Sequence, residues 1–174
     1  CKSTISEPAI SIHHAAHIGD IEMVREQLAA GIDPNSKNLF GYTPLFQARS
    51  SMDMITLLVD AGADVNDTGK GSSALHIHFF SYDMIRFLLD RGCDINAYDE
   101  LGDTVLHKVL DVPFPRLSHV KALLDGGADL DARDKNGLTP MDRFLDGKMN
   151  LNNERYKNEM TAIKNLLMKN GAKT

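Results

Sequence analysis

Tryptophan is absent from the 174-residue chain, and only 6% of the residues are aromatic. Only two cysteines occur, Cys1 and Cys93, too few for the disulfide framework on which small secreted domains depend. No uncharged apolar run approaches the roughly 18 residues that a transmembrane helix needs. A basic excess is missing too, because 24 acidic residues outnumber 19 Lys and Arg. The net charge of −5 excludes the overall basic character that is typical of proteins that bind nucleic acid or an anionic membrane.

The most informative feature that is present is an internal repeat. The segment 51–66 aligns with the segment 81–96 almost residue for residue. Each segment contains a glycine followed by a short Asp-containing ending, and the same glycine recurs along the chain at Gly31, Gly62, Gly92, Gly127 and Gly171. A second signature of the type Gly-Tyr-Thr-Pro-Leu follows, and its copies begin at Gly41, Gly71, Gly102 and Gly137. A period of about 30 residues is typical of a solenoid.

These two signatures in register resemble the ankyrin repeat. The resemblance implies an all-α solenoid of antiparallel helix pairs joined by outward β-turn fingers. It covers one domain, 9–174, after an N-terminal linker, 1–8. We expect five repeats, including terminal caps, at about 9–38, 39–68, 69–98, 99–133 and 134–174.

Local signals support the helix pairs. Pro44 and Pro140 suit the first turn of a helix, where an N–H is spare, and Thr43 and Thr139 precede them as N-caps. The second helices are predicted to be capped by Asp20, Ser51 and Ser81 and to end at Gly31, Gly62, Gly92 and Gly127. Apolar residues at helical spacing predict that Leu58 and Leu88 are buried. Insertions at 111–116 and 147–155 depart from the repeat.

Candidate chemical sites are few, and the repeat explains most of them. His13 and His17 have the i, i+4 spacing of metal ligands, with His14 between them, but no third ligand lies at a suitable spacing. In the family, the histidine slot occupied by His13, His76 and His107 bonds backbone between neighbouring fingers. Asp33, Asp64, Asp94 and Asp129 recur once per repeat and are interpreted as turn residues. We therefore expect no enzyme activity, no catalytic residue, no cofactor and no metal. A metal-binding or enzymatic protein that uses His13, His14 and His17 is the alternative from another class.

The remaining candidates are surface residues. In the family, partners bind the concave face built from the fingers and first helices. We expect this face to use Leu39, Phe40, Tyr42, Lys70, Tyr98, Glu100, Leu101 and Asp103. Bulky side chains in two fingers would flank a recess at the short finger, and charged residues would form its rim. Phe114, between two prolines, either folds back over the helix ends, which we favour, or acts as a second anchor.

The predicted function is therefore non-enzymatic recognition of another protein by a chain that is monomeric when free. Cys1, followed by a polar linker, resembles the mature end of a bacterial lipoprotein, although a trimmed chain would look the same. The only membrane contact expected is through a lipid on Cys1. With that lipid, the protein would face the bacterial periplasm. It would then suit an inhibitor or immunity protein that neutralises a toxin or effector. The alternative is a cytosolic or host-delivered bacterial ankyrin adaptor.

Overall fold

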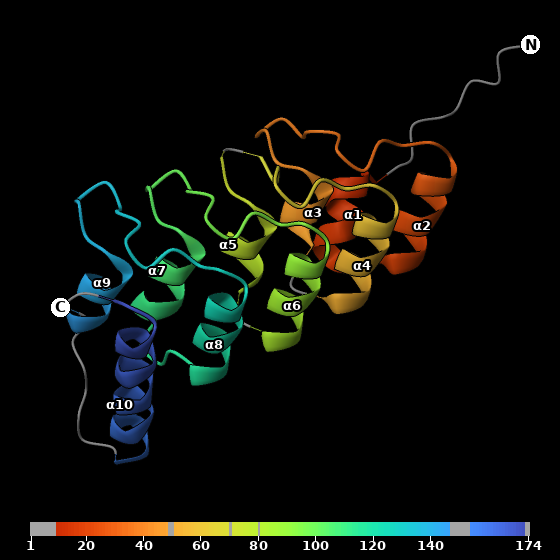
Figure 1. Cartoon of the computed structure of the whole chain (residues 1–174). Helices are drawn as coiled ribbons and strands as arrows, with labels where there is room; N and C mark the ends of the chain where they lie inside the picture. Colours follow the sequence, from red (N-terminus) through yellow and green to blue (C-terminus); the bar gives the residue numbers. More distant parts are fainter. Residues whose placement is uncertain (1–9, 49–50, 70, 80, 147–153, 173–174) are drawn as a thin grey trace, which may run out of the picture. The chain divides into compact units, whose positions relative to one another are not determined.

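A computed structural model describes residues 10–48, 51–69, 71–79, 81–146 and 154–172. Within these ranges all regular structure is helical, and no strand is present. The helices are α1 (Ile12–Ile18), α2 (Ile21–Ala29), α3 (Pro44–Gln47), α4 (Met52–Asp60), α5 (Ala74–His78), α6 (Tyr82–Asp90), α7 (Val105–Asp111), α8 (Leu117–Asp125), α9 (Pro140–Asp146) and α10 (Glu154–Lys169) (Figure 1). The expected all-α architecture is confirmed for the described residues.

The chain forms two compact units, Cys1–Lys70 and Gly71–Thr174. In the first unit, α1 packs against α3 and α2 against α4, while each short first helix also contacts the helix that follows it. In the second unit, α5, α7 and α9 form one layer, and α6, α8 and α10 form the other (Figure 1). Each unit is therefore a stack of helix pairs with two layers.

The helices begin and end where the sequence predicts. The side chains of Asp20, Ser51 and Ser81 accept hydrogen bonds from backbone N–H groups in the first turns of α2, α4 and α6. Thr43 caps α3, and Pro44 occupies its first turn. After the second helices, Gly31, Gly62, Gly92 and Gly127 have φ values of 88°, 96°, 81° and 88°. This left-handed conformation is available to glycine at little cost, so the chain can leave each helix there.

The core of each unit comes from the apolar stripe of its helices. Leu58 of α4 and Leu88 of α6 are fully buried, as are Ile55 and Ile85 one turn earlier. Cys93 is a free thiol and is also buried, as its small apolar slot predicts.

Three loops share one hydrogen-bonded turn, and each of them precedes a first helix, α3, α7 or α9. The loops begin at Asn38, Asp99 and Asp134. The side-chain oxygen of each accepts hydrogen bonds of 2.7–3.0 Å from the backbone N–H groups two and four residues later. The backbone N–H of the same residue donates to the carbonyl four residues later. Asn and Asp are favoured here because their short side chains replace backbone partners in a turn.

Candidate protein-binding groove

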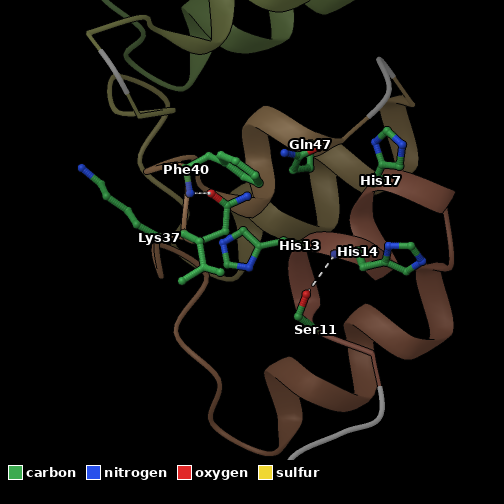
Figure 2. A pocket seen from close by; sticks show the side chains of 9 residues that line it. Ser11, His13, His14, His17, Lys37, Phe40 and Gln47 are labelled. Atoms are coloured by element: carbon green, nitrogen blue, oxygen red, sulfur yellow. Dashed lines mark hydrogen bonds between the residues drawn. The ribbon is translucent and has the colours of Figure 1, made fainter.

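A concave surface of the first unit lies between α1 and the loop that precedes α3. It has a volume of about 770 Å³, within the range of ligand-binding clefts. Its lining residues are Ser11, His13, His14, His17, Lys37, Asn38, Leu39, Phe40 and Gln47. In Figure 2, His14 and His17 lie on the α1 side of the groove, and Lys37 and Phe40 lie on the loop side.

Leu39 and Phe40 form an apolar rim on this groove. Leu39 is fully exposed and Phe40 is 71% exposed. Their position follows from the turn, because Asn38 Oδ1 accepts hydrogen bonds from the N–H groups of Phe40 and Tyr42 and so keeps the loop tip turned outward. Two neighbouring large apolar side chains in water are an unfavourable arrangement that a partner could relieve by covering them.

Tyr42 and Lys37 are held by contacts within the first unit. The Tyr42 ring stacks on Phe46 of α3, with ring centroids 3.9 Å apart, and is half-buried. Lys37 Nζ forms a 2.8 Å ion pair with Asp67. The hydrogen bond from Lys37 and a second bond from the Gly69 N–H lower the pKa of Asp67. Tyr42, a member of the predicted surface, and Lys37 are thus positioned before any partner arrives.

The histidines of the repeat bind backbone, as the resemblance implies. His13, His76 and His107 place Nε2 at 2.8, 3.0 and 3.1 Å from the carbonyl oxygens of Ser36, Asp103 and Leu138, in the loop that follows each. The Nδ1 atoms of His76 and His107 also accept the N–H of Ser73 and Thr104, respectively. The histidine slot is therefore structural in all three places.

The repeated aspartates act as turn residues. Asp33, Asp64, Asp94 and Asp129 each accept a bond of 2.8–2.9 Å from the N–H two residues later. In the described part of the chain, no group of three or more His, Cys, Asp or Glu residues could hold a metal ion. No described helix has the length and apolar character to cross a membrane.

In the second unit, three predicted surface residues are exposed. Tyr98 is 50% and Leu101 is 64% exposed, and Glu100 beside them is exposed as well. Lys135 Nζ donates to the Glu100 carbonyl, which ties this loop to the next one. A second concave surface of about 670 Å³ begins at Leu101 and extends to Lys108 and Arg143.

The expectation that Asp103 belongs to an exposed rim is wrong. Asp103 is only 7% exposed, because its carboxylate turns inward to Arg143 of α9, with a Nη2–Oδ1 distance of 3.1 Å. Arg143 also pairs with Asp134 at 2.6 Å and Asp111 at 3.7 Å. Burial alone would raise the pKa of Asp134, but the Leu138 N–H and Arg143 bonds outweigh it, so that pKa is lowered. Sequence reasoning missed Arg143 because two of its partners, Asp103 and Asp111, are far away along the chain.

The favoured expectation for Phe114, that it folds back over helix ends, is also wrong. Its side chain is 68% exposed. It stands at the edge of a small cavity of about 230 Å³ formed with Phe79, Val109, Val112, Arg116 and His119. Burial and the nearby Arg116 lower the pKa of His119. The Phe79 side chain, which is 8% exposed, provides the buried aromatic ring at this place.

Other sequence-based sites lie outside the described residues. They are Cys1, Lys70 and most of the insertion at 147–155.

Comparison with known proteins supports the resemblance. A family model described as ankyrin repeats (3 copies) matches residues 12–99. The E3 ubiquitin-protein ligase KEG of Arabidopsis thaliana is 35% identical over 70 residues, which represent 38% of this chain and 4% of that protein. The chain thus corresponds to a small part of that relative's length. The chain belongs to the ankyrin repeat family. Its repeats imply a protein–protein interaction module, and the family is typically non-enzymatic.

Proposed function

We propose that this protein binds another protein through the loops and first helices, with Leu39 and Phe40 as anchors in the first unit. The single observation that carries the proposal is the exposure of these two large side chains on the rim of the 770 Å³ groove. Interface energy is concentrated in a few large side chains that become fully desolvated, and aromatic residues are prominent among them.

The second unit supplies further candidate anchors, Tyr98, Leu101 and Phe114. All three are at least half exposed. Glu100, Lys70 and Tyr42 complete the proposed surface. The count of five repeats belongs to the same proposal. Under it the chain has no catalytic role and is monomeric when free.

The particular role that we propose is inhibition of a toxin or effector by a lipid-anchored envelope protein. A cytosolic adaptor is the alternative to this role. Mass spectrometry of the protein from its native cells tests the anchor directly. A diacylglyceryl-modified Cys1 is expected, and an unmodified cytosolic protein would contradict the anchor while leaving protein binding in place.

The binding proposal is tested by capturing the natural partner from those cells with the full chain and then titrating variants against it. Phe40→Ala and Tyr98→Ala are each expected to weaken binding about thirtyfold, since truncation of an anchor costs about 2 kcal/mol or more. The matched controls are Met52→Ala and Tyr82→Ala, which truncate exposed side chains on the second helices α4 and α6. Normal binding by both test variants, with weakened binding by the controls, would place the interface on the other layer and refute the proposal.

A further inference from the structure

We infer that the groove of the first unit receives an acidic segment of the protein partner that carries a large apolar side chain. This inference rests on the proposed function and adds the chemistry of the partner. Among the described residues that line the groove, the titratable side chains are His13, His14, His17 and Lys37. No carboxylate occurs in this described lining, although acidic residues outnumber Lys and Arg by 24 to 19 in the chain.

Comparison with the second unit shows how the charge of this groove differs. There, Asp99 and Asp134 begin the equivalent turns, and each is paired with a cation nine positions later, Lys108 or Arg143. The concave surface beside these ion pairs also has carboxylates in its lining, those of Asp103 and Asp111. In the first unit the same two positions hold Asn38 and Gln47, so the internal ion pair is replaced by two neutral amides. The carboxylate that would repel an acidic ligand is missing there.

The polar groups that remain in the groove are oriented as donors. Asn38 Oδ1 is already occupied by the N–H groups of Phe40 and Tyr42, which leaves its NH₂ group for a ligand. The His13 ring is fixed by the contact of Nε2 with the Ser36 carbonyl, 2.8 Å away, and a carbonyl can only accept, so Nε2 carries the proton.

The other nitrogen of His13 differs from its counterparts in the second unit. In His76 and His107, Nδ1 contacts the hydroxyl of Ser73 or Thr104 three positions earlier. The corresponding position before His13 is Ile10, which has no hydroxyl, and no described residue bonds to His13 Nδ1. Unlike its counterparts in the second unit, His13 Nδ1 therefore has no hydroxyl partner among the described residues of its own repeat.

Charge and shape together define the partner. Carboxylates are the acceptors that imidazolium, ammonium and amide donors bind well, and charge-assisted bonds are the strong ones. Lys37 shares its charge with Asp67, so the N–H groups of the histidines and of Asn38 are needed as further donors for a carboxylate. Leu39 and Phe40 beside these donors require an apolar side chain close to the carboxylates.

Fluorescence anisotropy of the full chain tests this with a short labelled peptide in which glutamates flank one leucine. Two matched peptides carry glutamine or lysine in place of glutamate. The acidic peptide is expected to bind at least about tenfold more tightly than either matched peptide, and less tightly as salt rises from about 0.05 to 0.5 M. Equal binding of the acidic and glutamine peptides would overturn the inference. So would a single-stranded DNA of equal charge that binds as well as the acidic peptide.

Variants separate this inference from the proposed function. His14→Gln/His17→Gln should reduce the preference for the acidic peptide, whereas the control His119→Gln, in the second unit, should not. If Phe40→Ala weakens binding of the natural partner but the chain binds the three peptides equally well, the proposed function stands and the inference of an acidic segment is wrong. If Phe40→Ala and Tyr98→Ala both leave the natural partner bound, the proposed function itself fails.

Discussion

Single residues that are distant in sequence meet around Arg143. Its guanidinium contacts three carboxylates, and the Asp134 side chain among them is completely buried. A buried charge pair adds little net stability compared with apolar packing, but removing one partner leaves an uncompensated charge. The cluster therefore makes the second unit sensitive to one substitution.

Replacing Arg143 by Met should lower the free energy of unfolding by about 3–5 kcal/mol, because Asp134 loses its cation in a buried site. Urea denaturation followed by circular dichroism measures the change. Arg25→Met is the matched control, since the Arg25–Glu22 pair is exposed and 4.0 Å long, and such pairs contribute about 0–1 kcal/mol. Similar losses in the two variants would contradict this account of the cluster.

His76 predicts a pH dependence. Its burial lowers its pKa below 6.5, and the bond to the Asp103 carbonyl only partly opposes this. The unfolded chain therefore binds the proton more readily than the folded one. The stability associated with neutral His76 is present above about pH 6.5 and is lost as the pH falls below it. The free energy of unfolding should decrease from about pH 7.5 to pH 5.5, and less steeply in His76→Gln. Parallel pH curves would show that His76 does not contribute.

At the scale of elements, the connection between α7 and α8 departs most clearly from the repeat among the described residues. It contains Pro113, Phe114 and Pro115. Pro115 is buried, whereas the ring between the prolines is mostly exposed. This arrangement favours a role in binding over a role in packing.

Phe114→Ser should therefore change the free energy of unfolding by only about 0.5 kcal/mol, as expected for an exposed side chain. Phe79→Ser, which removes the buried ring of the same cavity, should cost roughly 3–5 kcal/mol. Thermal and urea unfolding of both variants checks this difference. A loss of more than about 2 kcal/mol in Phe114→Ser would restore the interpretation that this ring covers the helix ends.

At the scale of the whole molecule, stability in a repeat protein comes from each repeat and its contacts with neighbours. A substitution in the core should consequently destabilise the repeats near it more than the distant ones. Leu58 and Leu88 are suitable probes because both are fully buried, Leu58 in the first unit and Leu88 in the second.

Leu58→Ala and Leu88→Ala should each cost about 2–5 kcal/mol, because a cavity remains where the side chain was. Hydrogen exchange followed by mass spectrometry should show faster exchange first in α1–α4 for Leu58→Ala and in α5–α10 for Leu88→Ala. A cost below about 1 kcal/mol would contradict the burial of these side chains. Equal acceleration of hydrogen exchange along the whole chain would contradict the expectation that the nearby repeats are destabilised most.

The features that the sequence predicted correctly are those with local causes. Ser51 caps α4 because its hydroxyl reaches an N–H three residues away, and Gly62 ends that helix because the left-handed conformation suits glycine. His107 could be assigned a structural role because the same residue recurs in the same slot of other repeats. The first kind of signal lies within one repeat, and the second needs only a comparison of the repeats along the sequence.

By itself, then, the sequence determined the helix pairs, their caps and the loops that carry Phe40 and Leu101. Only the tertiary structure decided which side chains of those loops remain free for a partner. Asp103 and Glu100 are equally polar in sequence, but Arg143 from another repeat buries the first and leaves the second exposed. Likewise, only the folded chain shows that Asn38 and Gln47 line a groove, whereas the equivalent positions of the second unit hold ion pairs. The physical reason is that exposure depends on which side chain from a distant segment arrives at the same place.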